Sequence, residues 1–191
     1  MASPMPDAAV PVSVLWRRLD HPGLEYCELS CGAESTLAGT VLAMPDAPMR
    51  VDYAIQCTPD WQTIRALVDM RYRGDRVRIA LSCDEDRRWR RDGVHVPALD
   101  GCADVDLSAT PSTNTLPIRR LELAVGESCD VTAAWIRLPE CELEPLAQRY
   151  TRIGERRYLY ESRGGAFTAE LEVDEHGLVL DYPPAWERVR R

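Results

Sequence analysis

Apolar and polar side chains alternate, with a period of two residues, along most of this chain. Between Arg76 and Cys83, for example, every second residue is apolar and the residues between are polar or small. Successive side chains of a β-strand point to opposite faces, so this pattern predicts a strand with one face on a core and the other toward water. Runs of this kind predict strands at residues 12–19, 24–29, 36–43, 51–57, 64–72, 76–83, 121–125, 131–137, 157–160 and 167–173.

Turn-forming residues separate the predicted strands, as in Arg73-Gly74-Asp75 and Gly164-Gly165. Glycine readily adopts the positive φ that tight hairpins require. The chain also has 14 prolines, and a proline in the interior of a helix costs about 3 kcal/mol. We therefore expect at most one or two short helices, in residues 139–148 or after Thr58.

These elements predict an all-β fold built on an antiparallel, strongly curved sheet or a barrel-like sandwich. Antiparallel strands joined by short turns must bury one face, and without helices to cover that face the sheet has to curl onto itself or onto a second sheet. Residues 1–191 are expected to form a single domain, because a chain of this length is sufficient for one core. A curled sheet of many strands leaves an interior that can take a small ligand.

An offset of 90 residues relates two strand-turn-strand segments of the chain. It pairs Gly74 with Gly164 and Asp84 with Asp174. Any two hairpins share such features, so chance and internal duplication both explain the similarity. Under duplication, the structural repeats would cover about residues 12–98 and 120–188, linked through residues 99–119.

Composition argues against several kinds of partner and chemistry. The formal net charge is −8, and an acidic globule repels nucleic acid. The seven cysteines include no Cys-x-x-Cys pair, so neither a disulfide framework nor a zinc site is expected. No cofactor and no metal are expected, and no segment approaches the ~20 apolar residues of a membrane span. The N-terminus has no pattern of a signal peptide, which predicts a cytoplasmic location.

Residues 99–123 depart from simple alternation. Two aspartates lie two residues apart, hence on one face of a strand, and a hydroxyl-rich loop and a pair of arginines follow. One hypothesis is a polar patch that meets a ligand head group at the mouth of a pocket, formed by Asp104, Asp106, Thr110, Asn114 and one of Arg119 or Arg120. The other is an internal latch, in which the arginine neutralises the carboxylates and the loop side chains satisfy backbone groups.

Two further functions stay open from the residues alone. A small hydrolase or isomerase could use Asp104 or Asp106 as general acid or base, although no serine elbow or metal-ligand spacing accompanies them and no catalytic residue is predicted. A protein-interaction module without a small ligand is the other. Outside residues 99–123, the densest group of polar aromatic residues is Tyr150, Tyr158 and Tyr160 with Gln148. Aromatic rings with a polar tip suit a wet pocket.

Long motifs distinguish this chain from a generic β protein. The longest reads DGCADVDL at residues 100–107, followed by TPSTNTLPIRRL at 110–121. Together with WRRLDHPGLE at 16–25 it resembles the bacterial putative glycolipid-binding family over nearly the whole chain. The resemblance implies an all-β fold of duplicated barrel-like halves, similar in shape to periplasmic carriers of lipoproteins, and a glycolipid-like ligand. The chain departs from the family pattern at 183–186, which reads PPAW where Pro-Gly and an apolar residue are expected.

The leading hypothesis is a binding protein whose curved sheet encloses an apolar cavity, with residues 104–120 at its rim. The expected ligand is an amphipathic or apolar small molecule such as a glycolipid. The candidate ligand-binding residues are Asp104, Asp106, Thr110, Asn114, Arg119, Arg120, Gln148, Tyr150 and Tyr158.

Overall fold

The computed structural model describes residues 11–190, which form one sheet of 15 strands and one short α-helix, α1 (Thr115–Leu121). The first half of the chain contains β1 (Val12–Arg18), β2 (Gly23–Ser30), β3 (Ser35–Ala43), β4 (Met49–Cys57), β5 (Thr63–Tyr72), β6 (Asp75–Cys83), β7 (Trp89–Arg91) and β8 (Val94–His95). The second half contains β9 (Asp104–Leu107), β10 (Ser128–Arg137), β11 (Glu142–Gly154), β12 (Arg157–Ser162), β13 (Phe167–Val173), β14 (Val179–Tyr182) and β15 (Trp186–Arg188). Single 3-10 turns lie at Pro97–Leu99, Ser112–Asn114 and Arg163–Gly165.

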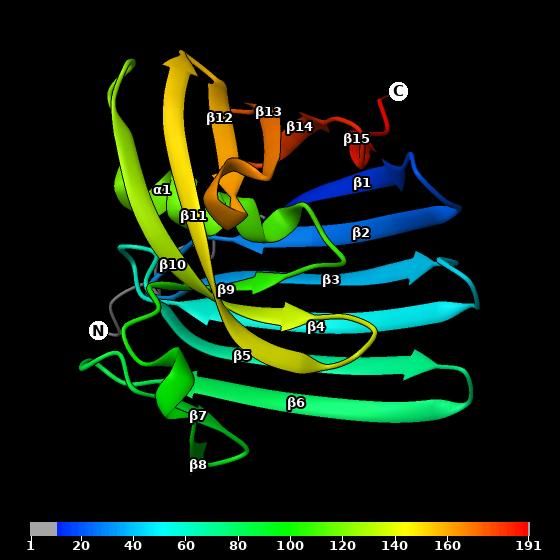
Figure 1. Ribbon diagram of the computed structural model, residues 1–191. Helices are drawn as coiled ribbons and strands as arrows, with labels where there is room; N and C mark the ends of the chain where they lie inside the picture. Colours follow the sequence, from blue (N-terminus) through cyan, green and yellow to red (C-terminus); the bar gives the residue numbers. More distant parts are fainter. Residues whose placement is uncertain (1–10, 191) are drawn as a thin grey trace, which may run out of the picture.

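The strands follow one another across the sheet almost in chain order. The order is β8-β7-β6-β5-β4-β3-β2-β1-β15-β14-β13-β12-β11-β10-β9, so the two halves of the chain meet where β1 pairs with β15. All neighbours are antiparallel except β9 and β10, which are parallel. The sheet curls strongly, and β10 and β11 cross in front of β3 and β4 (Figure 1). The expectation of an all-β, strongly curved sheet is confirmed, with β8 and β9 as unjoined edges.

All but one of the strands predicted from the alternation are present in the structure. The exception is 121–125, because Leu121 ends α1 and Glu122 follows it in the left-handed conformation, with φ of 47°. The predicted helix at 139–148 is also wrong, since most of that range lies in β11, and a turn follows Thr58. The helix that does form contains Pro117, which is tolerated in the first turn because backbone N–H groups have no intrahelical partner there.

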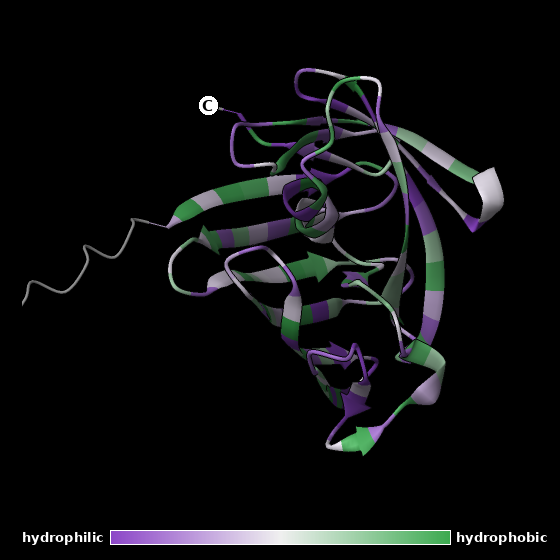
Figure 2. Cartoon of the chain, turned by 90° about the vertical axis from the view of Figure 1, so that its left-hand side faces the viewer, coloured by the Kyte–Doolittle hydropathy of each residue, from purple (hydrophilic) through white to green (hydrophobic). Residues whose placement is uncertain are grey.

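The core lies on the inner face of the curl. In β4 the side chains of Val51, Tyr53, Ile55 and Cys57 are buried, and the residues between them are partly exposed. Figure 2 shows the resulting alternation of hydrophobic and hydrophilic residues along the strands. Period-two patterning therefore sets which face of each strand packs inward.

The central segment, defined here as residues 104–121, occupies the hollow of the curled sheet (Figure 1). It contacts both arms of the sheet. The Tyr53 hydroxyl of β4 accepts a hydrogen bond from the Ser112 hydroxyl at 2.8 Å, and the Thr115 hydroxyl donates to the Gly177 carbonyl at 3.1 Å, before β14. Ser112 and Thr115 are fully buried. Most of the segment is thus buried inside the curl. Its polar side chains tolerate burial because they are hydrogen-bonded.

Turns after three strands share one hydrogen-bond pattern, at residues 58–62, 84–88 and 174–178. In each, the N–H of the first residue donates to the carbonyl of the fifth, and the N–H of the fifth donates to a side-chain oxygen of the first. The second and third turns are related by the 90-residue offset, but the first is not. Turn chemistry alone thus accounts for the match, and duplication stays a prediction.

Candidate functional site

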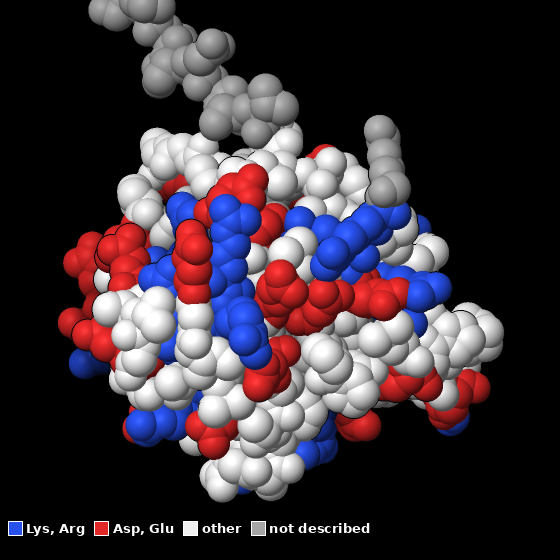
Figure 3. Space-filling model, turned by 90° about the horizontal axis from the view of Figure 1, so that it is seen from above, with Lys and Arg blue, Asp and Glu red and all other residues white. Residues whose placement is uncertain are grey.

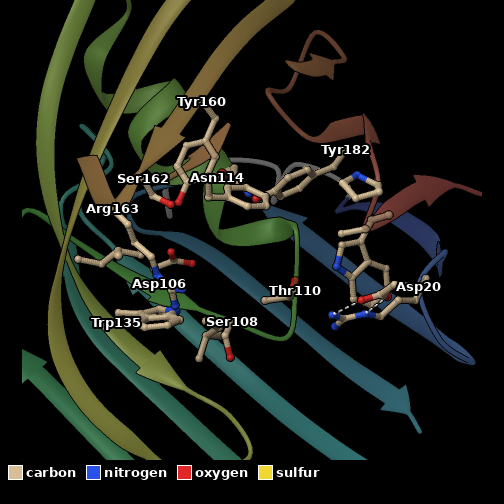
Figure 4. A pocket seen from close by; sticks show the side chains of 17 residues that line it. Asp20, Asp106, Ser108, Thr110, Asn114, Trp135, Tyr160, Ser162, Arg163 and Tyr182 are labelled. Atoms are coloured by element: carbon tan, nitrogen blue, oxygen red, sulfur yellow. Dashed lines mark hydrogen bonds and ion pairs between the residues drawn. The ribbon is translucent and has the colours of Figure 1, made fainter. Parts of the chain in front are cut away.

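A cavity of about 320 Å³ lies between the central segment and the second half of the sheet. The central segment contributes Asp106, Thr110 and Asn114 to its lining. Most of the opposite wall consists of aromatic rings, namely Trp135, Tyr160, Phe167, Tyr182 and Trp186. Arg18, Asp20 and Arg163 complete its charged groups (Figure 4). We call this cavity the ring-lined pocket.

Strand register explains how these side chains come together. In the β9–β10 ladder Asp106 is paired with Trp135, and both line the pocket. In β12 the alternation directs Tyr160 and Ser162 to the pocket and leaves Glu161 between them on the other face. The pocket is therefore built from regular strands, which position side chains more rigidly than loops do.

Asp106 accepts hydrogen bonds from two neighbouring side chains. The Thr113 hydroxyl donates to its Oδ1 at 2.7 Å, and Gln148 Nε2 donates to its Oδ2 at 2.7 Å. Gln148 Nε2 also donates to the Tyr160 hydroxyl oxygen at 3.1 Å. Burial raises the pKa of Asp106 above its ordinary value, because a low-dielectric surrounding disfavours the charged carboxylate. The group can accept hydrogen bonds when ionised and also donate one when protonated.

Asn114 is held in place from behind the pocket. The buried Tyr150 hydroxyl donates to its Oδ1 at 2.9 Å, and its Nδ2 donates to the Pro111 carbonyl at 3.0 Å. Burial raises the pKa of Tyr150 well above its ordinary value, so the phenol remains a hydrogen-bond donor. These contacts fix the orientation of the amide that faces the pocket.

Two arginines stack on two tryptophans of the pocket. The Arg163 guanidinium lies 5.1 Å from the Trp135 ring centre, and the Arg18 guanidinium lies 5.0 Å from the Trp186 ring centre. Arg18 also forms a two-pronged ion pair with Asp20, at 2.7 and 3.2 Å. Cation–π stacking immobilises a guanidinium while leaving its N–H donors available.

Below the pocket lies a buried carboxyl group, Glu25 of β2. It has 0% exposure, and its Oε1 accepts hydrogen bonds from the Tyr53 hydroxyl at 2.5 Å and the Thr110 hydroxyl at 2.6 Å. Burial raises the pKa of Glu25 to about 8. Its Oε2 has no hydrogen-bond partner among residues 11–190. Thr110 therefore connects this buried acid to the pocket lining.

The predicted site residues divide into three sets. Asp106, Thr110 and Asn114 line the ring-lined pocket, and Gln148 and Tyr150 hold them in place. The buried Asp104 and the partly buried Arg120 form an ion pair with each other, at 3.0 and 2.7 Å, and neither lines the pocket. Arg119 and Tyr158 line a separate cavity. The Asp104–Arg120 pair has the geometry of the latch hypothesis.

Several pocket residues have no counterpart among the predicted site residues: Trp135, Arg163, Trp186 and the underlying Glu25. The alternation does place Glu25 on the same face of β2 as Cys27 and Leu29. A carboxylate among apolar, inward-facing positions indicates a buried acid, so the sequence did carry a signal for Glu25. The arginine–tryptophan contacts join distant parts of the chain and carry no local signal.

No metal-binding group emerges from the described part of the chain: residues 11–190 contain no cluster of three or more His, Cys, Asp or Glu side chains placed to hold an ion. Within the same range, no helix has the length and apolarity needed to cross a membrane.

Similarity to known proteins agrees with this architecture. The profile of the family described as "Putative glycolipid-binding" matches residues 13–188. A solved structure of a DUF1089 family protein from Pseudomonas aeruginosa is similar in fold, with a TM-score of 0.79 and 35% sequence identity, covering 86% of this chain and 92% of that one. No curated protein matches. Because the family profile extends over nearly all of the sheet, the chain belongs to the putative glycolipid-binding family.

Proposed function

We propose that the ring-lined pocket binds the sugar head group of an amphipathic, glycolipid-like molecule. The observation that carries this proposal is the combination of Trp135, Trp186 and Tyr160 around the polar groups of Asp106 and Asn114. Aromatic faces stack on the C–H faces of a sugar ring, while a few oriented polar groups bind its hydroxyls. The family description supports a ligand of the same kind.

Pocket size favours a head group over a whole lipid. The volume of about 320 Å³ is near the lower end of the range of about 300–1,000 Å³ for small-molecule sites. Leu19 lies beside the pocket lining, since its N–H donates to the Ala185 carbonyl at 2.9 Å, and its side chain is 45% exposed. An apolar tail that leaves the pocket on this side would meet the exposed Leu19 side chain.

The arrangement of carboxylates favours binding over acid–base catalysis by paired aspartates. Asp104 is bound to Arg120 and does not line the pocket. Asp20 does line it, but it is paired with Arg18 and lies across the pocket from Asp106 (Figure 4). Among residues 11–190, each carboxylate that could serve Asp106 as the partner of a general acid and base pair is therefore held by an arginine, Asp104 by Arg120 and Asp20 by Arg18.

Titration calorimetry with octyl β-glucoside, below its micelle concentration, tests this proposal. We expect saturable binding to the wild-type protein and at least about tenfold weaker binding to Trp135→Ala, because truncating a central aromatic anchor commonly costs more than 1 kcal/mol. Free octanol, which has the tail but no sugar, should bind more weakly than the glucoside.

Trp61→Ala is the matched control for this experiment. Trp61 is also buried and also lies under an arginine, Arg119 at 4.9 Å, but it does not line the pocket. Its replacement should destabilise the protein to a comparable extent and leave glucoside affinity unchanged. Absence of saturable binding to the folded wild-type protein, or equal losses in the two variants, contradicts the proposal.

A further inference from the structure

Arg163 is an arginine of the ring-lined pocket without a carboxylate partner. Among residues 11–190, no Asp or Glu oxygen lies within 4.0 Å of its guanidinium nitrogens, whereas Arg18 is paired with Asp20. Elsewhere arginines and acids are commonly matched, as in the exposed pair of Arg157 and Glu170. Acidic and basic side chains are interleaved on the face that Figure 3 shows. Among residues 11–190 six other arginines also lack a carboxylate within 4.0 Å, so what distinguishes Arg163 is its place in the lining of the ring-lined pocket.

The position of Arg163 is fixed by its turn and by Trp135. All three residues of the turn Arg163–Gly165 have positive φ, with values of 53°, 65° and 88°. Residues with a Cβ atom rarely adopt this conformation, and arginine is not among those that favour it. The guanidinium lies 5.1 Å from the Trp135 ring centre, toward the inside of the pocket (Figure 4). A stacked guanidinium loses less conformational freedom when it binds an anion than a free one does.

Asp106 does not neutralise this charge. Its two oxygens accept hydrogen bonds from Thr113 and Gln148 and not from Arg163. Burial also raises the pKa of Asp106 above its ordinary value. The second carboxylate of the pocket, on Asp20, is already bound to Arg18. Arg163 and Asp106 are therefore the charged groups of the pocket lining that no ion pair engages among residues 11–190, and Arg163 is the one that an anionic molecule can match.

We propose that the ring-lined pocket selects an anionic head group and that Arg163 determines this selectivity, an inference that rests on the function proposed above. The ligand class is an amphipathic glycoside that carries a carboxylate, sulfate or phosphate on its sugar. An arginine fork binds each of these groups through two parallel N–H donors, which a lysine ammonium cannot do.

A pair of matched amphiphiles tests the inference: octyl β-glucoside and octyl β-glucuronide, which differ by one carboxylate. In low-salt buffer the wild-type protein should bind the glucuronide about tenfold more tightly, since a charge-assisted hydrogen bond is about twice as strong as a neutral one. Added sodium chloride should reduce this ratio, because it screens partly exposed charges.

Arg163→Gln should reduce the affinity ratio to near one. Arg119→Gln is the control, because Arg119 also stacks on a tryptophan but lines a separate cavity, and it should leave the ratio unchanged. Equal affinities of the wild-type protein for both amphiphiles overturn the inference and leave the proposed function intact. If neither amphiphile binds, both the inference about Arg163 and the proposed function are overturned. Binding of inorganic phosphate as tightly as the glucuronide would also overturn it, because the site would then be a simple anion site.

Discussion

Replacement of Arg120 by methionine should lower the free energy of unfolding by about 3–5 kcal/mol, the usual cost of leaving one member of a buried ion pair unpaired. The Asp104 side chain is 2% exposed, and its two oxygens accept hydrogen bonds from Arg120 Nε and Nη2. Without the arginine, this carboxylate must either remain charged in a low-dielectric surrounding or take up a proton. Urea-induced unfolding at neutral pH measures the loss.

Two further variants separate this effect from a general loss of charge. Arg157→Gln breaks the exposed pair with Glu170, in which both side chains are 58% exposed, and should change stability by about 0.5 kcal/mol or less. The double variant Asp104→Leu/Arg120→Met removes both buried charges and should recover most of the lost stability. A loss below about 1 kcal/mol for Arg120→Met alone would show that the pair does not act as a latch.

Replacement of Glu25 by glutamine should change how stability depends on pH. Burial raises the pKa of Glu25 to about 8 in the folded chain, from an ordinary value of 4.5, so the folded state holds this proton more tightly than the unfolded state. The contribution of Glu25 to stability is therefore complete below about pH 4.5 and is lost as the pH rises toward 8. Over this window the loss amounts to about 5 kcal/mol, from 1.36 kcal/mol per pH unit.

Glutamine keeps the carbonyl oxygen that accepts hydrogen bonds from Tyr53 and Thr110, but it does not ionise. The two proteins should have similar stability at pH 5, and Glu25→Gln should be more stable by several kcal/mol at pH 9. Unfolding curves at pH 5, 7 and 9 measure the difference in the free energy of unfolding between the two proteins. The other titrating groups are the same in both, so their contributions cancel in this difference. A difference that does not vary with pH would mean that Glu25 is ionised in the folded protein or reaches solvent.

The strands of the fold were predictable because burial on one face leaves a period of two in the sequence. The helix was not, since Thr115–Leu121 is less than two turns long and contains Pro117. So short a segment has no recognisable helical period, and its proline argued against a helix. Its buried apolar side chains, Leu116 and Ile118, belong to the same hydrophobic core as the strands, and nothing local distinguishes them from the buried residues of a strand.

The part of the site that lies in the central segment was predictable because its sequence departs from the period of two. Asp106, Thr110 and Asn114 were candidates because polar residues there interrupt the alternation. Whether such a segment borders a cavity or fills it depends on how far the sheet curls, which the alternation does not determine. The same limit applies to the stacking of Arg163 on Trp135, a contact between β10 and the turn after β12 that requires the folded sheet.

A crystal structure of the protein with octyl β-glucoside is the most direct measurement of where an amphiphile binds. The account predicts the sugar ring between Trp135 and Trp186, with a hydroxyl in hydrogen-bonding distance of Asp106 and the octyl chain directed out of the pocket. A glucoside found only on the outer face of the sheet, with the ring-lined pocket unchanged, would contradict it.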